Sequence, residues 1–161
     1  MSRFIADRMV DRLGRWLRLL GEDVAPAPAS TDDLVAAAGA GRVVLTRDTR
    51  LRARLALAGL PYLFVEDDRI EDQLRQVDRT HGLGGAAPFS RCSRCNTELT
   101  FHDPADFGDA IWPHVARTQP RIGQCATCGR RYWQASHIGR MAAFLRRALG
   151  RDLLPPTPPG G

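Results

Sequence analysis

Two pairs of cysteines constrain this chain more than any other feature of its sequence. Cys92 and Cys95 form one C-x2-C knuckle, and Cys125 and Cys128 form the other. The two-residue spacer lets both sulfurs of a knuckle reach one ion, and two knuckles make a tetrahedral thiolate site of the zinc-ribbon kind. Because four thiolates leave no open position, we expect a structural Zn²⁺. An iron–sulfur cluster or a redox-active pair is the alternative.

The length of 161 residues suits one globular domain joined to a small metal-stabilised unit. Hydrophobic residues make up 43% and charged residues 25%, which excludes disordered, collagenous and coiled-coil classes. No stretch is long and apolar enough to be expected to span a membrane. The charged residues Arg3, Asp7 and Arg8 interrupt the N-terminal segment where a signal peptide has its apolar core. These features predict a cytoplasmic protein with no membrane partner, in which cysteines bind metal rather than form disulfides.

The formal net charge of +5 lies in the C-terminal part of the chain. Residues 1–90 carry 13 arginines against 13 acidic residues, whereas residues 91–161 carry 10 against 5. This excess of arginine predicts that binding to a polyanion begins in the second part. A solvated arginine-rich surface is the alternative.

Short apolar runs alternate with stretches of helical periodicity over residues 1–82. Three runs have the length of buried strands, residues 4–6, 43–46 and 62–65. The alternation predicts a parallel sheet covered by helices on both faces. The glycine-rich residues 83–90 predict a linker, residues 91–150 a ribbon with a terminal helix, and residues 151–161 a flexible tail.

The expected helices have clear apolar faces. The face of the first helix, which Gly21 ends, contains Met9, Leu13, Trp16, Leu17 and Leu20. Thr31 is a good N-cap for the second helix. The face of the terminal helix contains Ile138, Met141, Phe144, Leu145 and Leu149.

Acidic residues follow all three predicted strands: Asp7 the first, Asp48 the second, and Glu66, Asp67 and Asp68 the third. The carboxyl ends of parallel strands meet at one edge of the sheet, so we expect these groups to converge. Clustered carboxylates repel one another, and Mg²⁺ or Mn²⁺ held by their oxygens relieves the repulsion. Such a site suits metal-assisted phosphodiester hydrolysis. The alternative is structural, since aspartate after a strand is also a common N-cap.

Other charged residues could support this site. Asp32 and Asp33 lie in the first turn of the second helix, where a carboxylate either joins the site or stabilises the helix dipole. The polar face of the first helix carries a basic stripe, Arg8, Arg12 and Arg15. The stripe either contacts phosphates or is a solvated helix face. Arg47 is expected to point into the crevice more directly.

Basic and aromatic residues alternate after the second knuckle. The candidates for nucleic-acid contact there are Arg130, Arg131, Tyr132, Trp133 and His137. Aromatic rings can stack on bases while arginines meet phosphates. Alternatively, Tyr132 and Trp133 cover the metal site and pack against the first domain. His137 is then either a core histidine or a residue at the edge of the catalytic site.

Together these motifs resemble the Mut7-C domain family. The resemblance rests on residues 4–9, 13–21 and 45–48, on the two knuckles, and on Tyr132–Trp133 and Ser136–His137. It extends to about Met141. It implies a PIN-like three-layer α/β/α domain with a parallel sheet, followed by a small C-terminal zinc ribbon and a terminal helix.

The resemblance also implies cleavage of RNA with Mg²⁺ or Mn²⁺. Asp7 and Asp48 match the strand-end acids of the family, and Asp33 resembles its helix acid. Glu66, Asp67 and Asp68 fall where a further acid is placed, with Asp67 and Asp68 as the candidates. The leading hypothesis is therefore a metal-dependent ribonuclease whose ribbon assists RNA binding. A non-catalytic nucleic-acid-binding module is the main alternative, a toxin-like protein masked by a partner is a third, and DNA stays open as the substrate.

Overall fold

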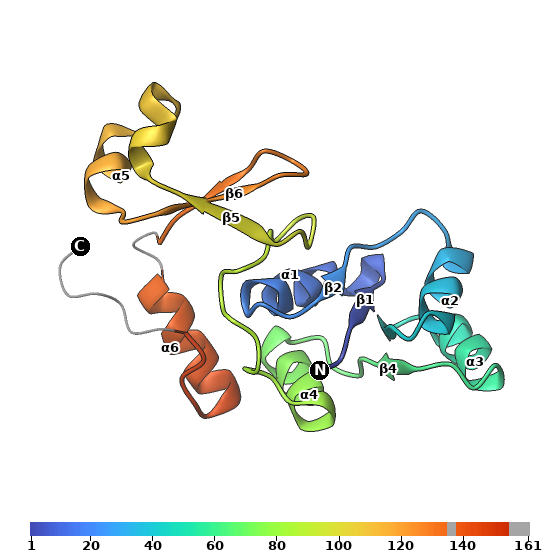
Figure 1. Ribbon diagram of the computed structural model, residues 1–161. Coiled ribbons are helices and arrows are strands. Elements are labelled where there is room, and N and C mark those ends of the chain that lie inside the picture. Colours follow the sequence, from blue (N-terminus) through green and yellow to red (C-terminus); the bar gives the residue numbers. More distant parts are fainter. Residues whose placement is uncertain (135–137, 155–161) are drawn as a thin grey trace.

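Two sheets of different kinds organise this computed structural model, which describes residues 1–134 and 138–154 (Figure 1). The first is a four-stranded parallel sheet in the order β2-β1-β3-β4. Its strands are β1 Phe4–Ala6, β2 Val24–Ala25, β3 Val43–Thr46 and β4 Tyr62–Phe64. The mixed α/β class with a parallel sheet, predicted from the alternation of strands and helices, is confirmed.

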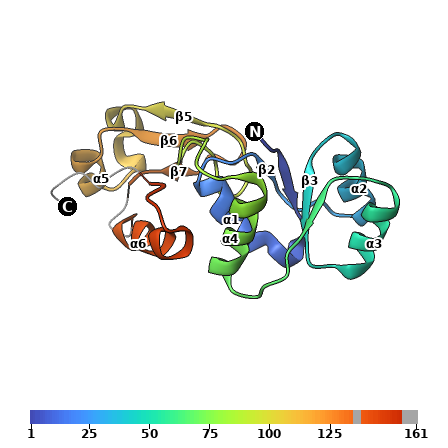
Figure 2. The same ribbon diagram turned by 90° about the horizontal axis from the view of Figure 1, so that it is seen from below.

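Helices cover both faces of the parallel sheet. They are η1 Arg8–Val10, α1 Asp11–Leu19, α2 Thr31–Gly39, α3 Thr49–Leu57 and α4 Ile70–His81. Successive strand residues face opposite sides, so Phe4 and Leu45 join a core with α1 and α4, while Ile5 and Val44 join a core with α2 and α3. Figure 2 shows these layers on either side of the strands.

The second sheet is antiparallel and follows the order β5-β6-β7. Its strands are β5 Leu99–His102, β6 Ile122–Cys125 and β7 Arg131–Tyr132. Two short helices, η2 Pro104–Ala110 and α5 Pro113–Thr118, form the excursion between β5 and β6. We refer to residues 91–134 as the ribbon and to residues 1–82 as the α/β unit.

The last described helix, α6 Ile138–Leu149, packs against the α/β unit. Its Leu145 is buried in the core formed by α1 and α4, and Phe144 stacks on Trp16 with ring centroids 4.8 Å apart. The Nε atom of Arg75 on α4 donates to the carbonyl oxygen of Ala148 at 2.6 Å. The sequence pattern grouped this helix with the ribbon, but in space it adds to the core of the α/β unit. No helix of residues 1–134 and 138–154 is both long and apolar enough to cross a membrane.

Three local features differ from the sequence expectation. The strand β2 was not predicted, because two residues show no periodicity. The first helix was expected to bury Met9, but its first turn is the 3-10 helix η1, which has fewer residues per turn. Val10 is therefore buried and Met9 is exposed. The second helix is capped by Ser30 rather than by Thr31, since the Ser30 side chain accepts the N–H of Asp33.

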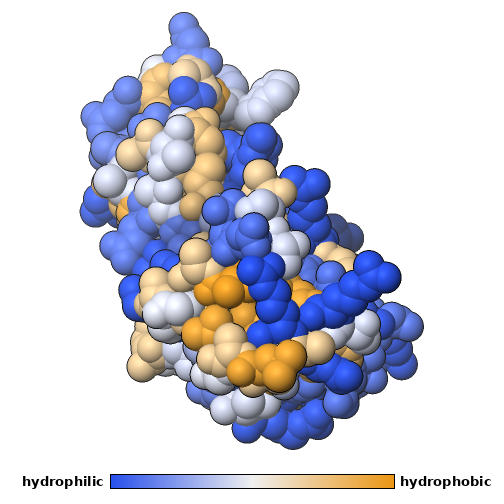
Figure 3. Space-filling view, turned by 90° about the vertical axis from the view of Figure 1, so that its right-hand side faces the viewer, coloured by the Kyte–Doolittle hydropathy of each residue, from blue (hydrophilic) through white to orange (hydrophobic). Residues whose placement is uncertain are grey.

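Exposed apolar residues are unevenly distributed over the surface. Figure 3 shows the side with α2 and α3, where the deepest hydrophobic colour lies on the α/β unit, and Leu57 of α3 is 90% exposed. On the ribbon, by contrast, the large exposed apolar side chains are aromatic: Phe101, Trp112 and Trp133. The two units therefore present different kinds of apolar surface.

The stretch 83–90 lies against the end of α1. The Phe89 N–H donates to the carbonyl oxygen of Leu19 at 2.8 Å. Gly21 has a φ of 89°, and a Cβ at this position would collide with the carbonyl group of Ala87. Only glycine allows this close approach without strain.

One buried arginine joins the two units. Arg18 on α1 is 1% exposed, and its Nη1 donates to the carbonyl oxygens of Ser93 and Arg94, the latter at 3.0 Å. These two residues are the spacer of the first knuckle. Burial lowers the pKa of Arg18, while the Asp11 carboxylate, 3.9 Å from Nη2, acts in the opposite direction. Its Nε and Nη2 have no hydrogen-bond partner among the described residues.

Asn96 completes this joint from the ribbon side. Its Oδ1 accepts the N–H of Val24 at 2.9 Å, and its Nδ2 donates to Asp23 at 2.7 Å. Asp23 in turn pairs with Arg42 at 2.8 Å. The knuckle is thus hydrogen-bonded to both α1 and the edge strand β2.

We predict that Arg18→Met lowers the free energy of unfolding by about 2 kcal/mol, because two carbonyl groups lose a charged donor. Urea denaturation of the zinc-loaded protein measures this loss. Arg15→Met is the matched control: Arg15 is exposed and pairs with Asp11 at 2.8 Å across one helix turn, so its loss should cost less than about 0.5 kcal/mol. Equal stabilities of the two variants would contradict the role of Arg18 in the joint.

Candidate functional site

The four cysteines converge at one point of the ribbon. Their Sγ atoms all lie within 4.8 Å of one another. Cys92 and Cys125 are buried, whereas Cys128 is exposed. Among residues 1–134 and 138–154, no other group of three or more His, Cys, Asp or Glu side chains comes close enough to share an ion. This cluster supports the predicted structural zinc.

Hydrogen bonds prepare the cluster for a cation. The hydroxyl of Tyr132 lies 3.0 Å from the Cys92 sulfur, and the Cys95 N–H donates to the same sulfur at 3.3 Å. Although burial opposes the charged form, these donors lower the pKa of Cys92 to about 6. Burial and the neighbouring thiols raise the pKa of Cys95 to about 12. Without a metal, the thiols cannot all ionise together, which a bound Zn²⁺ would reverse.

Two of the predicted acids meet at the edge of the parallel sheet. Asp7 at the end of β1 and Asp48 at the end of β3 line a pocket of about 210 Å³. The opposite wall includes Ser30 and Thr31 at the start of α2, and Arg8 also lines the pocket. We call Asp7 and Asp48 the acid pair.

Thr46 connects the acid pair. This buried threonine, the last residue of β3, donates its hydroxyl to Oδ2 of Asp7 and accepts the N–H of Asp48 at 2.9 Å. Asp7 is only 6% exposed, and its other oxygen accepts the N–H of Met9 at 2.6 Å. Within the described part of the chain, no arginine or histidine forms an ion pair with Asp7. The carboxylate is therefore buried beside hydrogen-bond donors but without a countercharge.

Both members of the acid pair are also helix caps. Asp7 caps η1, and Oδ1 of Asp48 accepts the N–H groups of Arg50 and Leu51 at 2.8 and 3.2 Å. Helix capping, the alternative role expected for these aspartates, is therefore found in the structure. Capping uses one oxygen of Asp48, and its Oδ2 accepts no hydrogen bond from the described residues. That oxygen and the carboxylate of Asp7 could hold a metal ion.

The acids of α2 lie outside the pocket. Asp33 is exposed and accepts a hydrogen bond from the Ser30 hydroxyl at 2.8 Å, which makes it part of a capping arrangement. Asp32 pairs with Arg54 of α3 at 2.7 Å. Ser30 does line the pocket, so Asp33 is connected to the pocket wall through its hydrogen bond with the Ser30 hydroxyl.

The acids after β4 are also outside the pocket. Asp67 and Asp68 are exposed, and Arg47 binds both: its Nη1 donates to the Asp67 carbonyl oxygen, and its Nη2 lies 2.6 Å from the Asp68 carboxylate. Glu66 is exposed as well, and its N–H donates to Gln76. Arg47 therefore faces the β4–α4 loop and not the acid pair.

The basic candidates occupy different surroundings. Arg12 is exposed, and Arg15 pairs with Asp11. On the ribbon, Arg130 is exposed, whereas Arg131 donates to the carbonyl oxygen of Ala110 at 2.8 Å. His137 lies outside the described residues.

Sequence reasoning missed two residues that shape these sites. Thr46 was assigned only to a buried strand, although a hydroxyl at the strand end next to an acid is a recognisable signal. Arg18 lies outside the basic stripe of Arg8, Arg12 and Arg15, and the sequence pattern gives it no role. Its signal is Gly14, four residues earlier, where a Cβ would lie 3.1 Å from the Arg18 Nη2.

Comparison with known families gives one match. The family model described as Mut7-C RNAse domain matches residues 2–145. The matched span contains both the acid pair and the four cysteines. No curated protein and no solved structure matched the chain.

We predict that the purified protein holds one Zn²⁺ per chain and that Cys125→Ser weakens metal binding by more than the 10- to 100-fold typical of losing an outer-shell partner. Metal analysis and the visible absorption of the Co²⁺-substituted protein measure this. Ser93→Ala, which keeps all four thiols in the same knuckle fold, is the control and should bind metal normally. Unchanged affinity in Cys125→Ser would exclude the four-thiolate site.

Proposed function

Because the chain belongs to the Mut7-C RNAse domain family, we propose that it is a metal-dependent ribonuclease whose cleavage site is the acid pair. The observation that carries this proposal is the buried carboxylate of Asp7, which shares a pocket with Asp48 and has no ion-pair partner among the described residues. An isolated buried carboxylate is costly, and a bound cation removes that cost.

The donor atoms fit Mg²⁺ or Mn²⁺. Carboxylate oxygens are the ligands that these hard cations prefer, and the pocket leaves room for water. When bound, such an ion lowers the pKa of water and neutralises charge on a phosphate. Asp7 would be held in place by Thr46 and the Met9 N–H, while Asp48 would offer the oxygen that capping leaves free. Arg8, which lines the same pocket, could pair with a phosphate oxygen.

The remaining acids take supporting roles in this proposal. Asp33 stands next to the pocket through Ser30 and would join as a water-mediated ligand. Asp67 and Asp68 are bonded to Arg47, and they would become available when Arg47 turns to a phosphate of the RNA. Hydrolysis at such a site would leave a 3′-hydroxyl and a 5′-phosphate.

The ribbon would assist RNA binding. It lies in the part of the chain that carries the whole net charge of +5. Arg130 and Arg131, with Arg12 and Arg15 on α1, would contribute cations that attract phosphates. In this role Zn²⁺ is structural and takes no part in the cleavage step.

A non-catalytic nucleic-acid-binding module is the competing function. It is favoured by the capping bonds of Asp7 and Asp48, which account for the positions of both side chains without a cation. The two functions differ in whether added Mg²⁺ or Mn²⁺ produces cleavage.

We predict that Asp48→Asn lowers the rate of RNA cleavage by at least about 100-fold, the upper range for loss of a partner one shell further from a metal. Asparagine also caps helices, so the fold should be retained. The assay uses end-labelled single-stranded RNA and the matching DNA, with Mg²⁺ or Mn²⁺ added and zinc kept bound.

Asp32→Asn is the matched control, because Asp32 is an exposed acid in the first turn of α2 that pairs with Arg54 and does not line the pocket. Its activity should equal that of the parent protein. Full activity of Asp48→Asn would exclude the acid pair as the cleavage site. Binding of RNA without cleavage by the parent in either metal would favour the binding module.

A further inference from the structure

We propose that a second pocket, between the ribbon and α6, binds an unpaired nucleotide of an RNA strand. This inference deepens the proposed function and rests on RNA as the substrate. The pocket has a volume of about 650 Å³, within the range of ligand sites. It shares no lining residue with the pocket of the acid pair. We call it the ribbon pocket.

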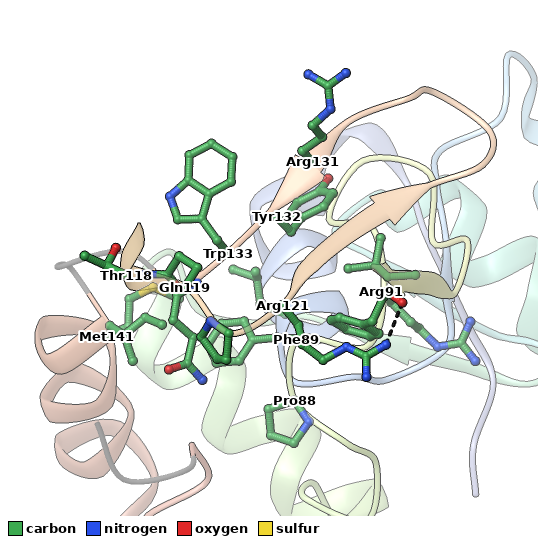
Figure 4. Close-up of a pocket in the computed structure, with 16 residues that line it drawn as sticks. Pro88, Phe89, Arg91, Thr118, Gln119, Arg121, Arg131, Tyr132, Trp133 and Met141 are labelled. Atoms are coloured by element: carbon green, nitrogen blue, oxygen red, sulfur yellow. Dashed lines mark hydrogen bonds between the residues drawn. The ribbon is translucent and has the colours of Figure 1, made fainter. Parts of the chain in front are cut away.

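Several separate segments of the chain line the ribbon pocket (Figure 4). Pro88 and Phe89 come from the stretch before the first knuckle, Tyr132 comes from β7, Trp133 directly follows β7, and Met141 comes from α6. Since α6 packs on the α/β unit, the ribbon pocket lies between the ribbon and the α/β unit.

Aromatic rings give the ribbon pocket its chemistry. Trp133 is 36% exposed and Phe101 45% exposed, although each has a large apolar surface that would be more stable if covered. Phe89 and Tyr132 add two further rings to the lining. Nucleic-acid bases stack on such rings whatever the nucleotide sequence of the strand.

The rings are held in place before any ligand binds. The Tyr132 hydroxyl lies 3.0 Å from the Cys92 sulfur, which ties one wall to the metal centre. Gly123 of β6 lets Phe101 lie across the sheet, because a Cβ there would be 3.2 Å from the phenyl ring. The Gln134 N–H, directly after Trp133, donates to Gln119 at 3.1 Å. A preformed site loses less entropy on binding.

The charges of the lining favour an anion. Three arginines line the ribbon pocket, and none of its described lining residues is acidic. Arg91 is paired with Glu98. The Arg131 guanidinium lies over the Phe107 ring, 5.3 Å from its centroid, and donates to the Ala110 carbonyl oxygen. Arg121 is exposed, and its guanidinium uses only Nη2, on the Phe101 carbonyl oxygen at 2.7 Å. Its other donors are available for a phosphate.

A nucleotide combines the two features that this lining complements. Its base is a flat ring for Trp133 and Phe101, and its phosphate is an anion for Arg121. The amides of Gln119 and Gln134 can meet the polar edge of a base. Because the faces of a base are covered in a duplex, the ribbon pocket selects RNA that has a single-stranded segment.

The test measures binding apart from cleavage. The parent protein is the zinc-loaded Asp48→Asn variant, and fluorescence anisotropy gives its Kd for a labelled single-stranded RNA. Adding Trp133→Ala should raise this Kd about tenfold, the order of one lost stacking contact. Trp112→Ala is the matched control, since Trp112 is a ribbon tryptophan that is 75% exposed and outside the pocket. It should leave the Kd unchanged.

Additional variants and RNAs distinguish a loss of base stacking from a loss of folding and from a loss of charge. Trp133→Phe should recover most of the affinity, and zinc content should be the same in all variants. RNA of equal length with abasic sites should bind the parent as weakly as normal RNA binds Trp133→Ala. Arg121→Ala should weaken binding of both RNAs and reduce its dependence on salt, unlike Arg117→Ala, an exposed arginine of α5 outside the pocket.

Each outcome bears on a separate claim. Two results would overturn the ribbon pocket as a base site. One is equal Kd values for Trp133→Ala and Trp112→Ala, and the other is that Trp133→Ala raises the Kd for abasic RNA by the same factor as the Kd for normal RNA. If the base site fails in this way but the wild type still cleaves RNA, the proposed ribonuclease function stands without the ribbon pocket. Binding that depends on Trp133 in a wild type that cleaves nothing would overturn the ribonuclease and keep the pocket. A parent that binds no RNA overturns both.

Discussion

The contact between the Arg18 guanidinium and the spacer of the first knuckle fixes how the two units sit together. The carbonyl oxygens of Ser93 and Arg94 accept its hydrogen bonds, and the same backbone turn presents Cys92 and Cys95 to the metal. Burial lowers the pKa of Arg18, while the Asp11 carboxylate and, to a smaller extent, Cys92 and Cys95 act in the opposite direction. The cation of one unit is therefore matched to the anionic centre of the other. Metal centre and joint cannot be treated as independent features.

The metal centre is connected in the same way to the rest of the ribbon. Tyr132 reaches Cys92 with its hydroxyl and gives its ring to the ribbon pocket. A single side chain thus connects the thiols with the ribbon pocket. At the acid pair, Thr46 has a role like that of Tyr132 at the metal centre. Its hydroxyl lies between the Asp7 carboxylate and the backbone N–H of Asp48. In both places a side-chain hydroxyl helps to set the position of the thiols or carboxylates around it.

Much of the fold could be predicted from local patterns. The strands β1, β3 and β4 and the meeting of Asp7 with Asp48 follow from apolar runs and parallel topology, and the four-cysteine cluster follows from spacing. What could not be predicted depends on distant partners. Arg18 is buried only because the ribbon docks on α1, and Asp67 and Asp68 lie outside the pocket, where Arg47 binds them. The periodicity of α6 likewise predicts an apolar face but does not show that α4 is the helix it packs against.

That docking of α6 has a topological consequence. The chain leaves the α/β unit through residues 83–90, which lie against α1, and returns to it at α6, whose Leu145 is part of the same core. The ribbon is therefore an insertion anchored at both ends, and not an appendage on a tether. A protease that cut the stretch 83–90 would nick the molecule without releasing either half, since the far end of the ribbon would still be anchored through α6.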